Sequence, residues 1–193
     1  MLDKIYVALI HYPTYNKHHE VVTTAVTNVD IHDIARVCKT YGIKGYYVVN
    51  NLVAQQNIVK RVLRYWLEGF GVEYNHTRTE ALENVKLVSF IEDVIKDIIK
   101  IEGEKPIFIT TSARSHEKKL VSFEEMRKRV RVETHPILFG LGTGWGLAEE
   151  VVEMSNFLLE PIRGVSEYNH LSVRAAASII IDRIISERSD MYG

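Results

Sequence analysis

Short apolar runs recur along the chain and alternate with longer stretches of helical periodicity. Their length and composition predict buried strands at residues 5–10, 46–49, 85–88, 107–110, 137–140 and 157–159. The periodicity predicts helices at residues 31–41, 57–70, 90–100, 123–130, 147–154 and about 172–187. Such alternation is typical of an α/β fold in which helices flank both faces of a mostly parallel sheet.

Capping signals support several of these predicted helices. Ser89 with Glu92, and Ser122 with Glu125, match the capping box that often begins a helix. Asp30 is a further N-cap candidate. With 193 residues and no linker-like segment, the sequence predicts one domain over 1–193.

The overall charge does not favour nucleic-acid binding, because 24 basic residues face 25 acidic ones and the net charge is -1. Any RNA contact therefore requires a local patch. The single cysteine, Cys38, is expected in the core. Neither a signal peptide nor a membrane span is evident, so we expect no membrane contact and a cytoplasmic protein.

Residues 11–28 form a long connection between the first predicted strand and the first predicted helix. A βα connection usually has about 2–6 residues, and longer ones are often functional. The β-branched run within this segment equally favours a small hairpin attached to the sheet.

A glycine-rich loop follows the predicted strand at 137–140. Residues 139–147 read Phe-Gly-Leu-Gly-Thr-Gly-Trp-Gly-Leu. Glycine permits positive φ and close approach of a ligand to the backbone, so the spacing favours a cofactor-binding loop. It is not a P-loop, and Trp145 or Leu147 stands where a dinucleotide fingerprint needs its last glycine. The loop also follows the fifth predicted strand, whereas that fingerprint follows the first.

Three segments in order resemble motifs of the SPOUT superfamily of knotted RNA methyltransferases, most closely its small TrmH-like members. Residues 137–147 resemble the second motif, Glu-Pro-Ile at 160–162 the next loop, and Leu-Ser-Val-Arg-Ala-Ala at 171–176 the third motif. The resemblance implies S-adenosylmethionine as cofactor and no metal. It assigns cofactor contacts to Thr111, Phe139, Gly140, Leu141, Gly142, Thr143, Gly144, Trp145, Gly146, Glu160, Pro161, Ile162, Asn169, His170, Leu171, Ser172 and Ala175.

A fourth similarity lies near the start of the chain. Asp-Ile-Ala-Arg at 33–36, followed by Tyr-Gly at 41–42, resembles the first motif of TrmH-like proteins. It implies that Arg36 is the catalytic arginine, with Asp33 beside it. The resemblance also implies a trefoil knot formed by residues 140–161 and the last helix, a homodimer through that knot, and tRNA or rRNA as substrate.

Two positions depart from the ribose-methylating members of the superfamily. No carboxylate occurs in the glycine loop, where Thr143 and Gly144 stand, and His170 replaces an asparagine. Both ribose 2'-O and a base nitrogen such as guanine N1 therefore stay open as acceptors. A base nitrogen needs a general base, and the candidates are Asp30, Asp33 and Glu167. Two alternatives also stay open: an RNA-binding or assembly module without catalysis, and an enzyme for another nucleotide.

Two segments are candidate RNA contacts. The first is the basic cluster of Lys118, Lys119, Arg127, Lys128, Arg129 and Arg131, for which a solvated helix face is the more ordinary interpretation. The second mixes aromatic, amide and cationic groups that suit unpaired bases, at His11, Tyr12, Tyr15, Asn16 and Lys17.

Overall fold

The computed structural model describes residues 2–111 and 120–186. Its centre is a seven-stranded sheet with the order β5-β4-β1-β8-β6-β9-β7, and every strand pair in it is parallel. The strands are β1 (Ile5–Ile10), β4 (Gly45–Val49), β5 (Val85–Val88), β6 (Ile107–Thr111), β7 (Leu120–Val121), β8 (Ile137–Gly142) and β9 (Phe157–Leu159). The prediction of a parallel α/β fold is confirmed.

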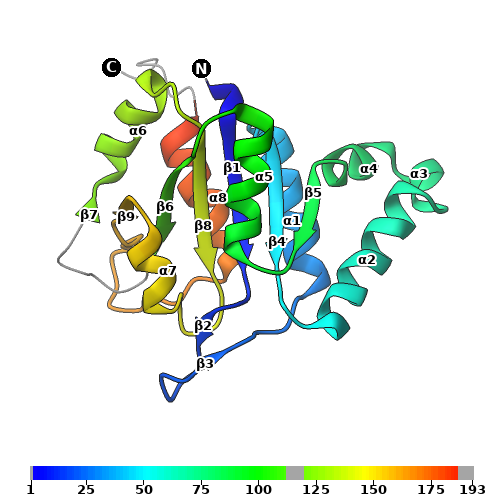
Figure 1. Cartoon of the computed structure of the whole chain (residues 1–193), viewed down its shortest axis with the longest axis horizontal. Helices are drawn as coiled ribbons and strands as arrows, with labels where there is room; N and C mark the ends of the chain where they lie inside the picture. The colour runs from blue at the N-terminus through cyan, green and yellow to red at the C-terminus, as the bar shows by residue number, and fades with distance from the viewer. Residues whose placement is uncertain (1, 112–119, 187–193) are drawn as a thin grey trace.

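Helices cover both faces of this sheet (Figure 1). The face with α5 (Ile91–Glu102) and α7 (Glu149–Met154) encloses the smaller core cluster. The opposite face carries α1 (Asn28–Thr40), α6 (Phe123–Val132) and α8 (Val173–Ile185). Between β4 and β5 the chain forms α2 (Val53–Leu67), α3 (Gly71–Tyr74) and α4 (His76–Leu82), which project to the right in Figure 1, beyond the β5 edge of the sheet. A short 3-10 helix, Leu2–Lys4, precedes β1.

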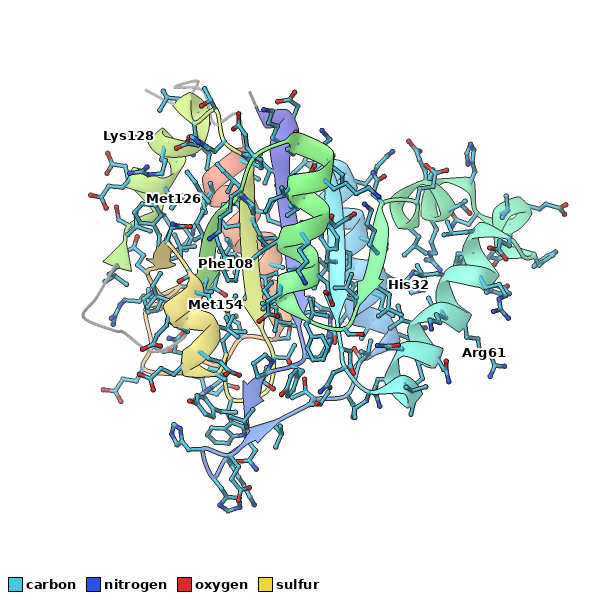
Figure 2. The ribbon with its side chains drawn as sticks, viewed as in Figure 1. His32, Arg61, Phe108, Met126, Lys128 and Met154 are labelled. Atoms are coloured by element: carbon cyan, nitrogen blue, oxygen red, sulfur yellow. The ribbon has the colours of Figure 1, made fainter. Side chains whose placement is uncertain are left out.

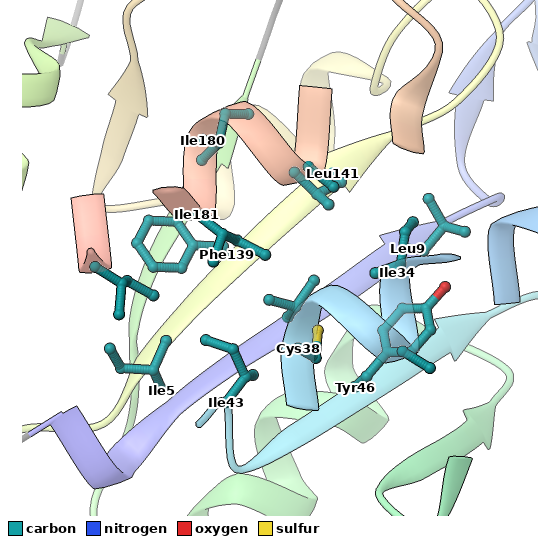
Figure 3. Close-up of a cluster of buried hydrophobic side chains, with 14 of the residues drawn as sticks. Ile5, Leu9, Ile34, Cys38, Ile43, Tyr46, Phe139, Leu141, Ile180 and Ile181 are labelled. Carbon is teal, nitrogen blue, oxygen red and sulfur yellow. The ribbon is translucent and has the colours of Figure 1, made fainter. Parts of the chain in front are cut away.

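The larger core cluster lies between the sheet and helices α1 and α8. Figure 3 shows Ile34 and Cys38 of α1 and Ile181 of α8 facing the apolar side chains of β1 and β8. Cys38 is buried, as predicted, and burial raises the pKa of its thiol. This packing fixes α1 and α8 beside each other, so the loops that precede the two helices are held near the carboxyl ends of the central strands.

Helix starts confirm one capping prediction and correct two. The Ser122 hydroxyl accepts from the Glu125 backbone N–H at the start of α6, as predicted. The Ser89 prediction is wrong, because α5 begins after Phe90 and the carboxylate of Asp93 accepts from the Phe90 N–H at 3.2 Å.

The N-cap predicted at Asp30 is also wrong. Helix α1 begins earlier, after Thr27, whose hydroxyl accepts from the Asp30 backbone N–H. The Asp30 carboxylate instead accepts from the Thr27 hydroxyl through Oδ2, and its Oδ1 forms an ion pair described below.

The 11–28 connection contains a hairpin, as one of its two interpretations predicted. Strands β2 (Thr14–Tyr15) and β3 (Val21–Val22) pair antiparallel outside the main sheet. The hairpin lies beyond the carboxyl end of β8 (Figure 1). In the described part of the chain, no helix is long and apolar enough to cross a membrane. Strand order alone does not test the trefoil knot, which stays a prediction.

Candidate functional site

The glycine loop leaves β8 at the centre of the sheet, and its shape depends on glycine. Gly144 has φ +60°, and a Cβ built there would lie 2.9 Å from Cγ2 of Thr24 and 3.3 Å from the carbonyl oxygen of Tyr15. Gly146 has φ +107°. Any side chain at 144 would strain the backbone and collide with the hairpin segment, so the loop can take this path only with glycine.

The hairpin braces this loop through backbone hydrogen bonds. The Tyr15 N–H donates to the Gly146 carbonyl at 2.9 Å, and the Trp145 N–H donates to the Tyr15 carbonyl at 3.1 Å. The Thr143 hydroxyl donates to the Ile10 carbonyl at 3.1 Å. The 11–28 segment therefore fixes the glycine loop, which gives its unusual length a structural reason.

A pocket of about 380 Å³ opens between the glycine loop, the start of α1 and the start of α8. This volume lies within the range of about 300–1,000 Å³ that small-molecule sites occupy. Five predicted cofactor residues line it: Gly142, Thr143, Gly144, Leu171 and Ser172. We call it the glycine-loop pocket.

The remaining lining of the glycine-loop pocket was not predicted as cofactor contact; it comprises His11, Thr24, Ala25, Asp30, Val173 and Arg174. His11 is fully buried at the end of β1, and its Nδ1 lies 2.9 Å from the Thr24 hydroxyl. Its Nε2 has no hydrogen-bond partner among the described residues. Burial lowers the pKa of His11 to about 4, so the ring is neutral near pH 7.

An ion-pair network joins α1 to α8 beside this pocket. Arg174 Nη1 lies 2.9 Å from Asp30 Oδ1, and Arg174 Nε lies 3.3 Å from Asp33 Oδ2. The Asp30 side chain is 8% exposed and that of Asp33 is 52% exposed. The arginine thus neutralises a buried carboxylate and also orients a solvent-facing one.

Arg36 and Asp33, the predicted catalytic residues, line a second hollow between α1 and α8 with Ser172, Arg174 and Ala175. Ser172 and Arg174 belong to both hollows, so the hollow around Arg36 adjoins the glycine-loop pocket. The structure therefore brings Arg36, Asp33, Ala175 and the glycine loop into one continuous region.

Other predicted cofactor residues lie outside the lining of the glycine-loop pocket. The side chains of Phe139 and Leu141 are core residues. At the neighbouring strand ends, the Thr111 hydroxyl donates to the Gly140 carbonyl at 3.3 Å, and the Glu160 carboxylate accepts from the Phe123 N–H at 2.7 Å. Six further predicted residues also lie outside the lining of the glycine-loop pocket: Trp145, Gly146, Pro161, Ile162, Asn169 and His170. Residues 112–119, which follow Thr111, are outside the described residues.

The basic cluster of α6 mainly serves packing and capping. The guanidinium groups of Arg127 and Arg131 donate to carbonyl oxygens at the end of α8. Arg129 lies over the Phe157 ring at 4.6 Å, and Lys128 pairs with Glu124 at 2.6 Å. Figure 2 shows Lys128 and the buried Met126 on this helix. Lys118 and Lys119 lie outside the described residues. Contacts within the protein therefore account for the four described members of this cluster, Arg127, Lys128, Arg129 and Arg131.

Comparison with solved structures identifies the class of fold. The A. aeolicus TrmH/SpoU tRNA modifying enzyme superposes with a TM-score of 0.54 at 19% identity, covering 97% of this chain and 77% of that chain. The predicted TrmH-like fold is thereby confirmed. A sequence profile described as SAM-dependent RNA methyltransferase matches residues 4–186, so the chain belongs to this family.

Two relatives add context. A protein of Oleidesulfovibrio alaskensis named tRNA (guanine-N(1)-)-methyltransferase is 42% identical over 183 residues, which are 95% of this chain and 42% of that protein. The chain therefore spans less than half the length of this relative. An uncharacterised protein of Aquifex aeolicus is 36% identical over 184 residues, which are 95% of this chain and 89% of its own length.

Proposed function

We propose that this protein transfers the methyl group of S-adenosylmethionine to a nucleotide of RNA, with tRNA as the substrate to test first. The observation that carries the proposal is the adjacency of the glycine-loop pocket to Arg36 in a member of a SAM-dependent RNA methyltransferase family. A cofactor bound in this pocket would lie next to an exposed arginine, a group suited to RNA phosphate.

The residues of the glycine-loop pocket suit this cofactor. Glycine at 144 lets the loop pass close to Thr24 and Tyr15, and this path forms one wall of the pocket. The pocket offers polar groups at Ser172 and at the unpartnered Nε2 of His11, as the amino-acid, ribose and adenine parts of the cofactor require. When bound, S-adenosylmethionine supplies an electrophilic methyl group on sulfur.

Arg36 is the proposed catalytic arginine. It is exposed, and its guanidinium makes no ion pair within the described residues. A planar guanidinium holds a phosphate through two parallel hydrogen bonds, and this orients the neighbouring nucleotide. Asp33 lies one helical turn earlier and is 52% exposed. Arg174 pairs with its Oδ2, so we assign Oδ1 to take up the proton that a base nitrogen releases. Glu167 is exposed on the loop before α8, outside the lining of both hollows.

Guanine N1 is the first acceptor to test, because the O. alaskensis relative carries that activity in its name. That name describes a longer protein, of which this chain spans 42%. We therefore test ribose 2'-O as the competing acceptor. We further propose that two copies associate through a knotted C-terminal segment, and that the protein acts in the cytoplasm, where tRNA modification would place it.

The test incubates purified protein with a tRNA transcript pool and labelled S-adenosylmethionine, followed by nucleoside analysis. We expect labelled 1-methylguanosine, whereas a labelled ribose would shift the acceptor to the 2' oxygen. Arg36→Ala should lower methyl transfer by at least about 100-fold while the affinity for cofactor stays unchanged. Cofactor binding with no transfer to any RNA would instead support the non-catalytic module. Light scattering on the same sample tests the dimer.

A further inference from the structure

Helices α1, α2 and α4 line a third hollow, a cleft of about 670 Å³ on the side of α1 away from α8. Its lining includes His32, Arg36, Arg61, Tyr65, Trp66 and Arg78, and we call it the arginine cleft. Figure 2 labels His32 on α1 and Arg61 on α2. None of the family motifs recognised in the sequence lies on α2 or α4.

The arginine cleft carries an excess of positive charge. Arg36, Arg61 and Arg78 make no ion pair within residues 2–111 and 120–186. The carboxylate in the lining belongs to Asp33, which Arg174 already pairs at 3.3 Å. The first turn of α1 also faces the cleft through Asn28, and a helix N-terminus favours anions. The cleft therefore attracts a ligand with several negative charges.

Aromatic rings form the floor and one wall of the same cleft. Trp66 is 8% exposed, with the Arg78 guanidinium 4.9 Å from its ring centroid and the His32 ring edge-on at 5.6 Å. Tyr65 is 47% exposed, so one ring remains open to a ligand. The half-buried Arg78 covers the buried Trp66 ring, while the exposed Tyr65 ring offers a stacking surface. Nδ1 of His32 is buried without a hydrogen-bond partner among the described residues.

The arginine cleft is continuous with the proposed catalytic region. Asp33 and Arg36 line both the arginine cleft and the hollow between α1 and α8. That hollow shares Ser172 and Arg174 with the glycine-loop pocket. A polyanionic chain with one nucleotide at Arg36 can thus extend along α1 into the cleft.

We propose that the arginine cleft is a subsite for an unpaired nucleotide of the RNA substrate, adjacent to the nucleotide that receives the methyl group. In this subsite, Arg61 contacts the phosphate of the unpaired nucleotide, and the base of that nucleotide stacks on Tyr65. Stacking on an aromatic ring combined with arginine contacts is the chemistry that recognises unpaired RNA. This inference rests on the proposed function for the identity of the ligand, and it extends that function to a second site.

The test compares two variants with a matched control on the same helix. Arg61→Ala and Tyr65→Ala remove the two proposed contacts, whereas Arg64→Ala removes an equal charge from an exposed position outside the cleft lining. Fluorescence anisotropy measures binding of a labelled tRNA transcript between low and high salt.

Arg61→Ala should reduce the slope of log affinity against log salt by about one, the value of one phosphate contact. Tyr65→Ala should weaken binding by at least about fivefold with an unchanged salt slope, because stacking is uncharged. Affinities and slopes for both variants equal to those of Arg64→Ala would overturn the subsite.

Calorimetry with S-adenosylmethionine separates this result from the proposed function. Unchanged cofactor affinity in each variant shows that the fold is intact. If RNA binding depends on Arg61 and Tyr65 but the wild type transfers no methyl group, the proposed enzymatic function is overturned and the subsite is supported. If the wild type transfers methyl groups but both variants bind RNA as the Arg64→Ala control does, the proposed function is supported and the subsite is overturned. No RNA binding by the wild type would overturn both.

Discussion

The glycine-loop pocket and the arginine cleft lie on opposite sides of α1 and are built by different means. The first is shaped by backbone at the carboxyl end of the sheet, where positive φ at Gly144 and hairpin hydrogen bonds fix the loop. The second is shaped by side chains of three helices, in which an arginine packs on Trp66. The charged residues of the first, Asp30 and Arg174, are paired with each other, whereas the second gathers three arginines beside aromatic rings.

This difference determines which substitutions should matter at each place. A ligand held by backbone is lost when the backbone cannot follow its path, so a single added Cβ should have a large effect. A ligand held by several long side chains loses one contact at a time, so each substitution should have a moderate effect. The predictions below test that contrast.

The largest effect is expected from Gly144→Val. The valine Cβ would sit 2.9 Å from Cγ2 of Thr24 at a φ of +60°, which forces the loop away from the hairpin. We expect the affinity for S-adenosylmethionine, measured by calorimetry, to fall by about 100-fold or more, equivalent to about 2.7 kcal/mol.

Gly103→Val is the matched control for that variant. Gly103 has φ +78° at the end of α5, with no atom within 4 Å of a built Cβ. Both variants carry the cost of a left-handed backbone, about 1–2 kcal/mol of stability. The affinity for cofactor should fall in Gly144→Val and stay unchanged in Gly103→Val. Equal affinities would contradict a cofactor site at the glycine loop.

An intermediate effect is expected from the two histidines, one on each side of the comparison. Burial lowers the pKa of His11 to about 4 from 6.5. Between these values the unfolded chain binds a proton that the folded chain does not, so stability is complete above pH 6.5 and falls as the pH drops towards 4. At pH 5 this loss amounts to about 2 kcal/mol.

Urea unfolding at pH 7.5 and pH 5 measures that loss in the wild type and in His11→Gln, which cannot titrate. The stability difference between the two pH values should shrink by about 2 kcal/mol in the variant. His32→Gln should show a smaller change of the same sign, because His32 is only half-buried and burial also lowers its pKa. An identical pH dependence in wild type and His11→Gln would show that His11 is not buried as described.

Most of the fold was predictable, since each apolar run forms a strand of the central sheet, although the edge run at 85–88 is buried only at Val85. The run at 5–10 became the strand Ile5–Ile10, and that at 137–140 extended to Gly142. Helices α3 and α4 were not predicted, because they contain four and seven residues, too few for a helical period to show. The helix start at Thr27 was missed because Asp30 offered a competing polar side chain within the same turn.

The site was predictable where a local pattern carries it, and not where distant segments meet. The spacing of the glycines predicted a ligand-binding loop, and Gly142 and Gly144 line a pocket. His11 and Arg174 come from opposite ends of the chain, and only the packing of β1, α1 and α8 places both in that pocket. The arginine cleft had no local signal, because Arg36, Arg61 and Arg78 are dispersed over three helices.

The smallest effect is expected from Arg78→Ala, which tests whether the floor of the arginine cleft is held by the cation–π contact with Trp66. Such a contact contributes about 0.5–1 kcal/mol, so urea unfolding should show a loss of about that size. Arg78→Lys is the control, since it keeps the charge but loses the planar stacking. Because the glycine-loop pocket is built separately, cofactor affinity should stay unchanged in both variants. A fall in cofactor affinity comparable to that of Gly144→Val would show that the two regions are one coupled site, and the contrast between backbone-built and side-chain-built recognition would fail.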